Sequence, residues 1–130
     1  MGAEVKILIV DDHEMIRTGI RSILRSRGEF QVCGEASDGE EAIEKARELK
    51  PDLVILDINM PMLDGFGAAK VIKQDIPEVQ ILFFSMHTGR NLVEQAKLAG
   101  AQGFVAKDQA GSLLLTAVET MSRNLTFFPT

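Results

Sequence analysis

A short apolar run that stops at a carboxylate constrains the fold of this chain more than any other stretch. Residues 53–56 read Leu-Val-Ile-Leu and are followed at once by Asp57. An unbroken apolar run of this length predicts a strand buried on both faces, as in a parallel sheet. Asn59, Pro61 and Gly65 come next, which is a loop composition. Asp57 is therefore expected at the carboxyl end of a central strand, where open α/β sheets bind ligands.

The rest of the chain alternates between strand and helix patterns. Further strands are predicted at 5–10, 30–33, 79–84 and 103–106. Helical spacing of apolar residues predicts helices at 13–27, 39–50, 64–74, 91–99 and 112–123. Five strands that alternate with five helices over short loops predict an α/β fold, a doubly wound parallel sheet with right-handed crossovers.

Composition limits the classes of function. A chain of 130 residues suffices for one domain with its own core, and its net charge of −5 argues against direct nucleic-acid binding. No apolar stretch is long enough to span a membrane, and no signal peptide is visible. Cys33 is the only cysteine, which excludes an internal disulfide and fits a reducing compartment. We therefore expect a cytoplasmic domain without membrane contact.

Polar side chains follow four of the predicted strands. They are Asp11 and Asp12 after the first, Asp57 after the central one, Ser85 after the fourth and Lys107 after the fifth. The ends of parallel strands share one edge, so these groups should converge. Two unit charges about 4 Å apart interact with about 4 kcal/mol at an effective dielectric of 20, so three carboxylates require a cation. Oxygen ligands of this kind predict a site for a hard divalent ion, above all Mg²⁺.

Such a set of groups can transfer a phosphoryl group. A carboxylate beside Mg²⁺, an ammonium and a hydroxyl can attack phosphorus and form an acyl phosphate. Asp57 stands alone on the central strand and is the better nucleophile, whereas the adjacent Asp11 and Asp12 are typical of a metal-binding pair. The alternative, that each polar residue only terminates its strand, suits any one of them better than all five together.

The same residues carry a resemblance to a known family. The matching pieces are Ile-Leu-Ile-Val-Asp-Asp at 7–12, Pro-Asp-Leu-Val-Ile-Leu-Asp at 51–57, Met-Pro at 60–61, Asp-Gly at 64–65, Ser85, and Gly-Phe-Val-Ala-Lys at 103–107. Over nearly its whole length the chain resembles the CheY-like receiver domain of two-component response regulators. The resemblance implies a flavodoxin-like (βα)5 fold with strand order 2-1-3-4-5.

A narrower resemblance concerns the branch within that family. Residues 11–20, 34–39, 85–87 and 107–108 are similar to the NarL/LuxR-type branch, in which a receiver precedes a helix-turn-helix DNA-binding domain. The resemblance implies a receiver domain at 1–123 and a tail at 124–130, the start of a linker to a DNA-binding domain that this chain does not include. We expect an excised receiver. The alternative is a stand-alone, single-domain regulator that acts by protein–protein binding.

The family resemblance also implies roles for the site residues. Asp57 would accept a phosphoryl group from a sensor histidine kinase. Asp12 would bind Mg²⁺ directly and Asp11 mainly through water, and Asp57 and the backbone carbonyl of Asn59 would complete the metal site; Mn²⁺ could substitute. Lys107 would pair with the Asp57 carboxylate and later with the phosphoryl group.

Four residues are implicated in switching and in the lifetime of the phosphorylated state. Ser85 would turn inward to the phosphoryl group, and Phe104 would follow it from an exposed to a buried position. Asn59 and His87, each two residues beyond a strand-end residue, would tune the phosphoryl lifetime. The resemblance further implies a phosphorylation-dependent homodimer and DNA contact only through the output domain.

Two other functions are compatible with the same fold. A phosphohydrolase that passes through phosphoaspartate would need a general acid where Asn59 stands. A flavin carrier on the same fold would need a Ser/Thr/Gly-rich phosphate loop where Asp11 and Asp12 stand. We therefore expect no enzyme activity beyond the domain's own phosphoryl transfer and dephosphorylation.

Several other side chains are expected to serve the fold. Asp38 should cap a helix, with Glu41 completing a capping box, and Asp64 should cap the next one. The remaining expectations are a solvated face at Arg17, Arg21 and Arg25, a helix-start role for His13, and a tail whose Phe127 and Phe128 pack back on the domain.

Overall fold

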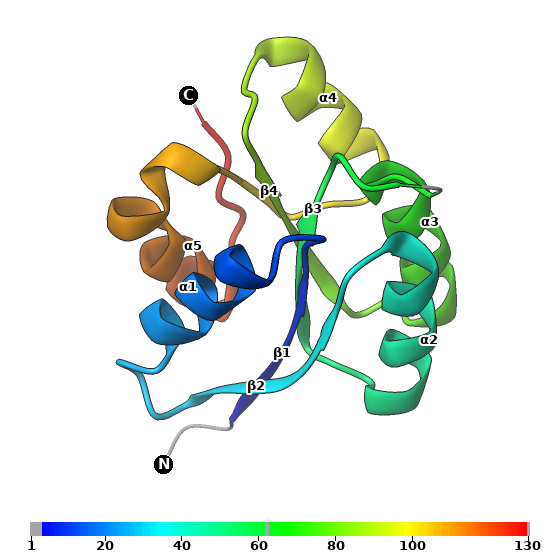
Figure 1. The fold of residues 1–130 in the computed structure, drawn as a ribbon. Coiled ribbons are helices and arrows are strands. Elements are labelled where there is room, and N and C mark those ends of the chain that lie inside the picture. The colour runs from blue at the N-terminus through cyan, green and yellow to red at the C-terminus, as the bar shows by residue number, and fades with distance from the viewer. Residues whose placement is uncertain (1–3, 62, 130) are drawn as a thin grey trace.

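The five predicted strands form one parallel sheet (Figure 1). In this computed structural model, residues 4–61 and 63–129 are described. The strands are β1 (Val5–Val10), β2 (Phe30–Ala36), β3 (Leu53–Asp57), β4 (Gln80–Ser85) and β5 (Gly103–Ala106). Their order is β2-β1-β3-β4-β5, and every neighbouring pair is parallel. The prediction of a flavodoxin-like sheet with order 2-1-3-4-5 is confirmed.

Helices cover both faces of the sheet (Figure 1). They are α1 (Glu14–Leu24), α2 (Gly39–Leu49), α3 (Gly65–Asp75), α4 (Arg90–Leu98) and α5 (Leu115–Met121). The buried residues of α1 and α5 belong to one core and those of α2, α3 and α4 to the other. Within the described part of the chain, no helix combines the length and apolarity needed to cross a membrane.

Strand residues alternate between these two cores. In β3, Val54 and Leu56 face the α2–α3–α4 side, whereas Leu53 and Ile55 face α1 and α5. All four side chains are fully buried. Residues 53–56 are therefore all apolar because both faces of their strand are covered.

Helix ends follow the predicted capping chemistry. The Asp38 side chain accepts a hydrogen bond from Glu41 N at 2.8 Å, and Asp64 accepts one from Gly67 N at 2.9 Å. The capping box differs in its second half, because the Glu41 carboxylate accepts from Ser37 N at 2.7 Å and not from the cap residue itself. Both caps are confirmed, and Glu41 binds the residue before the cap instead of the cap residue.

Three boundaries differ from the sequence prediction by three residues or more. The second strand continues to Ala36 because its pairing with β1 resumes after a register shift, which leaves Cys33 without a partner. The first helix ends at Leu24, and a turn leads from there into β2. After β5, a 3₁₀ turn at Lys107–Gln109 and a π-helical turn at Ala110–Leu114 start the last helical segment earlier than expected.

The C-terminal tail returns to the sheet. Asn124 adopts a left-handed conformation with φ of 63°, and the chain then runs back beside β5, where Phe127 forms a parallel bridge with Gly103. Figure 1 shows this segment in red. Phe127 and Phe128 are each half-buried, one against each core. The prediction that they pack on the domain is confirmed.

Candidate functional site

Three strands end in the same small turn. In each, the side-chain oxygen of the strand-end residue accepts the backbone N–H two residues further on. The pairs are His13 N to Asp11 Oδ1 at 2.9 Å, Asn59 N to Asp57 Oδ1 at 3.2 Å, and His87 N to Ser85 Oγ at 3.1 Å. This local hydrogen bond stops the strand and fixes the side chain at the sheet edge. The same hydrogen bond thus ends each strand and holds a site residue in place.

Lys107 joins two of these strand ends. Its Nζ lies 2.7 Å from Asp11 Oδ2 and 3.4 Å from Asp57 Oδ2, and its side chain is only 10% exposed. Asp11 Oδ2 is buried and receives no well-aligned hydrogen bond from a described residue, so its partner is the charge of the lysine. The predicted convergence of Asp11, Asp57 and Lys107 is therefore found.

The electrostatics of Asp57 reflect this setting. Burial raises the pKa of the carboxyl above its ordinary value, and the nearby charge of Asp11 raises it further. Lys107 and the hydrogen bond from Asn59 N act in the opposite direction without cancelling the effect of burial. A raised pKa means that additional positive charge at this edge would be favourable.

His13 contacts both members of the acidic pair. Its Nδ1 lies 3.1 Å from Asp11 Oδ1 and 3.0 Å from Asp12 Oδ1. One ligand atom from each of these three residues lies within 4.8 Å of the others. The carboxylate oxygens of Asp11 and Asp12 are hard donors that fit a divalent cation of the Mg²⁺ type. His13 also starts α1, as predicted, but without a side-chain cap hydrogen bond.

Sequence reasoning missed a support behind this edge. Arg17 Nη1 donates to the backbone oxygen of Asp11 at 2.6 Å, and its Nε donates to Glu35 at 2.8 Å. Arg21 pairs with the same glutamate. The expectation of a solvated arginine face is therefore wrong for these two, because Glu35 on β2 draws them in; Arg25 is exposed. The only sign of this contact in the sequence was Glu35, an acidic residue that follows the apolar part of the second strand.

Gly65 allows the start of α3 to lie close to the end of β3. Gly65 N donates to the Ile58 backbone oxygen at 2.8 Å. A Cβ at position 65 would meet the backbone oxygen of Asp57 and would lie 2.8 Å from Ile58 Cα. Only glycine lets the start of α3 approach the strand end this closely.

The remaining predicted residues lie around this centre. Ser85 is buried one position beyond Phe84, which pairs with Asp57 across β3 and β4. Phe104 pairs with Phe83 across β4 and β5, and its ring is fully buried. The other two members of the set, Asn59 and His87, have exposed side chains.

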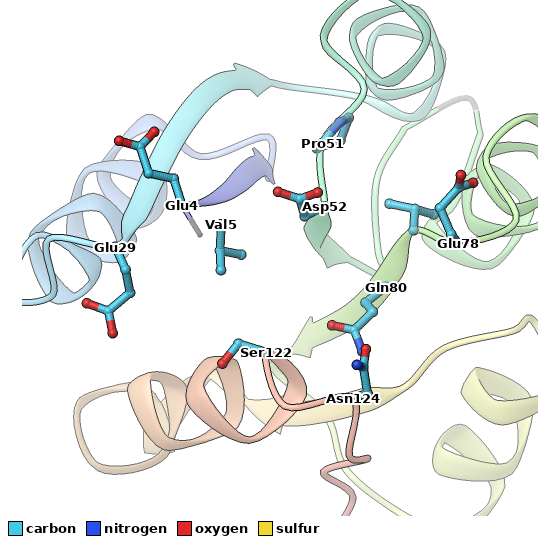
Figure 2. A pocket seen from close by; sticks show the side chains of 10 residues that line it. Glu4, Val5, Glu29, Pro51, Asp52, Glu78, Gln80, Ser122 and Asn124 are labelled. Atoms are coloured by element: carbon cyan, nitrogen blue, oxygen red, sulfur yellow. The ribbon is translucent and has the colours of Figure 1, made fainter. Parts of the chain in front are cut away.

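A separate hollow lies at the opposite edge of the sheet (Figure 2). Its volume is about 720 Å³, and four carboxylates stand around it, from Glu4, Glu29, Asp52 and Glu78. Asp52 accepts a hydrogen bond from Lys6 N at 2.8 Å. Figure 2 shows the four side chains well separated around the rim, so they do not form a compact ligand set.

Comparisons with known proteins agree with this site. A family model described as the response regulator receiver domain matches residues 7–119. Response regulator protein VraR of Staphylococcus aureus is 39% identical over 124 residues, which cover 95% of this chain and 59% of that protein. The chain thus spans about three-fifths of the length of the curated relatives it matches.

Solved structures show the same likeness. A two-component response regulator of the LuxR family from Aurantimonas sp. SI85-9A1 superposes with a TM-score of 0.92 at 34% identity, over 96% of this chain and 89% of that one. The CheX–CheY complex with BeF₃ and Mg²⁺ from Borrelia burgdorferi matches with a TM-score of 0.86 at 30% identity, over 96% and 92% of the two chains. This chain belongs to the response regulator receiver domain family, as a CheY-like receiver of the NarL/LuxR-type branch.

Proposed function

We propose that the chain is a phosphorylation switch in which Asp57 accepts a phosphoryl group from a phosphohistidine of a sensor histidine kinase. The observation that supports this most directly is the buried Asp57 carboxylate at the end of β3, with Lys107 between it and Asp11. A carboxylate fixed beside a cation at a sheet edge can act as a nucleophile toward phosphorus, and the cation can bind the phosphoryl oxygens.

The chemical step follows from these positions. A carboxylate oxygen of Asp57 forms a bond to phosphorus while the bond from phosphorus to the histidine nitrogen breaks. The electron pair of that bond returns to the imidazole nitrogen. Lys107 balances negative charge on the phosphoryl oxygens, because its Nζ already lies within 3.4 Å of the acceptor carboxylate.

Mg²⁺ would be held by Asp12, Asp57 and the backbone carbonyl of Asn59, with Asp11 acting through water. When bound, it would neutralise phosphoryl oxygens as charge develops on them. The acidic cluster at Asp11, Asp12 and His13 and the raised pKa of Asp57 support a cation at this edge. The CheY in the Borrelia burgdorferi structure was solved with Mg²⁺ and BeF₃.

Ser85 and Phe104 would respond to phosphorylation of Asp57 and alter the surface of the domain. The hydroxyl of Ser85 accepts from His87 N, so its reorientation toward a phosphoryl group would exchange that hydrogen bond for a new one. Burial of the Phe104 ring belongs to the same state, and Asn59 and His87 would set how long the phosphoryl group lasts. Their exposed side chains suit them to control the access of water.

The output would lie in a longer regulator. Membership in the NarL/LuxR-type branch supports a cytoplasmic, helix-turn-helix transcription regulator, in which residues 1–123 form the receiver and 124–130 begin the linker. Because the chain spans only part of its curated relatives, DNA contact and phosphorylation-dependent dimerisation are proposed for the whole protein and not for this domain alone.

The test is the intact mass of the chain after incubation with phosphoramidate, with and without Mg²⁺. One added phosphoryl group is expected only with Mg²⁺. Asp57→Asn should abolish the gain, whereas Asp108→Asn, which changes an exposed aspartate next to Lys107, should retain it. A gain that survives Asp57→Asn would assign the acceptor elsewhere, and no gain in the unaltered chain would contradict the proposed function.

A further inference from the structure

The C-terminal tail pairs with β5 through its backbone. Phe104 N donates to the Phe127 oxygen at 2.9 Å, and Phe127 N donates to the Gln102 oxygen at 3.0 Å. β5 is an edge strand of the sheet, so without the tail its outer side would present unpaired backbone groups. The tail therefore acts as a short sixth strand.

Two aromatic rings anchor this strand from opposite sides of the sheet. Phe127 packs on the core beneath α1 and α5, and Phe128 packs on the core beneath α4. Lys97 of α4 places its Nζ 4.9 Å from the centroid of the Phe128 ring, a cation–π contact. Leu125, in the same tail, is by contrast largely exposed.

The tail meets the switch residue directly. The backbone N–H of Phe104 is bonded to the tail, and the Phe104 ring belongs to the core on which Phe128 packs. Phe104 and Ala106 line a cavity of about 490 Å³ together with Phe127, Phe128 and Thr88 of the β4–α4 loop. A change in the position of the Phe104 ring would therefore alter the surface on which the tail rests.

We propose that the outer edge of β5 is a strand-binding surface whose occupant is the chain's own segment 125–129, and that phosphorylation of Asp57 strengthens this docking through Phe104. The linkage rests on the proposed function. Its direction rests on the role proposed for Phe104: the docked tail accompanies a fully buried Phe104 ring, and a phosphoryl group would hold that ring buried. By reciprocity, a docked tail should favour phosphorylation to the same extent.

The docking is of a kind that can be reversed. It consists of two backbone hydrogen bonds at a single bridge, two half-buried rings and one cation–π contact. Segments with so few contacts open at much lower free energy than a central strand such as β3. Phosphorylation thus has an element with two accessible states to act on.

Amide hydrogen exchange of the whole chain, followed residue by residue by NMR, tests the docking. Phe127→Ala should speed exchange of the Phe104 amide by about tenfold or more, because the bonded carbonyl leaves with the tail. Leu125→Ala is the matched control and should change it by less than about twofold. Lys97→Gln, which removes the cation from the Phe128 ring, should speed it by about two- to fivefold. In all variants the Leu56 amide reports whether the domain itself remains folded.

The same measurement after phosphoramidate and Mg²⁺ tests the linkage. Exchange of the Phe104 and Phe127 amides should slow by about fivefold or more, with no change in Asp57→Asn. Unchanged exchange in a sample whose mass shows the phosphoryl group would overturn the linkage and leave the proposed function intact. A sample that gains no phosphoryl group would overturn the proposed function and the linkage with it. If Phe127→Ala leaves the Phe104 amide unchanged, the docked strand itself is refuted.

Discussion

Lys107 lies closer to Asp11 than to the carboxylate it is expected to serve: its Nζ is 2.7 Å from Asp11 Oδ2 and 3.4 Å from Asp57 Oδ2. Both aspartates are almost completely buried. One cation thus balances two carboxylates that would otherwise repel each other in a medium of low polarity. The lysine has a structural task as well as its proposed catalytic one.

Lys107→Met should therefore destabilise the domain even without any phosphoryl chemistry. Removing one partner of a buried ion pair leaves an uncompensated charge, and the expected loss is about 3 kcal/mol. Mg²⁺ should restore part of it, since it supplies positive charge at the same edge. Urea unfolding with and without Mg²⁺ measures both effects. Lys70→Met, at an exposed position of α3, is the control and should change the free energy of unfolding by less than about 0.5 kcal/mol.

Asp57→Asn should stabilise the domain at neutral pH. Burial raises the pKa of Asp57, so the folded state binds this proton more tightly than the unfolded state does. Stability contributed by the protonated form is then full at low pH and is lost as pH rises from the ordinary value through the raised one. Asparagine removes this loss, and each 1 kcal/mol gained raises Tm by about 4 °C in a domain of this size. The gain should vanish at acid pH, where the wild-type carboxyl is protonated; thermal unfolding at several pH values checks it.

The sequence was sufficient for the parts of the site that end strands. Asp11, Asp57 and Ser85 each interrupt an apolar run, and parallel strands bring such ends to one edge whatever lies between them. The same holds for the helix cap at Asp38, where a short-range hydrogen bond decides the boundary. These predictions depended only on short-range hydrogen bonds and on the rule that parallel strands end at one edge of the sheet.

Contacts between distant segments could not be predicted in this way. The pairing of Arg17 with Glu35 depends on how α1 packs over β2, and both residues read as ordinary surface charges. The strand pairing of Phe127 was likewise invisible, because a single bridge leaves no periodic pattern. The last helical segment starts earlier than the sequence predicts because Gly111 and Ser112 lie inside a π-helical turn that propensity does not predict.

Arg17→Gln should weaken both the fold and the metal site. The guanidinium holds the backbone oxygen of Asp11 at 2.6 Å and binds Glu35, so its loss frees the loop that carries the acidic pair. Hydrogen bonds to charged groups contribute about 1.5–3 kcal/mol, and a loss of about 2 kcal/mol is expected. Calorimetric titration should show weaker Mg²⁺ binding. Arg25→Gln, on the same helix but exposed, should leave both unchanged; an equal effect there would point to general loss of charge.

Two glycine substitutions should act in opposite directions. A Cβ at Gly65 would meet the backbone of Asp57 and Ile58, which cannot move aside as a flexible side chain can. Gly65→Ala should therefore destabilise the domain by about 1–3 kcal/mol and slow phosphoryl acceptance, because the displaced backbone carries Asp57. At Gly19, an exposed position inside α1, a Cβ would meet nothing within 4 Å. Gly19→Ala should stabilise the helix by about 1 kcal/mol without affecting phosphorylation. Chemical unfolding and the phosphoramidate mass assay on the two variants separate a backbone clash beside the acceptor from a general effect of replacing glycine.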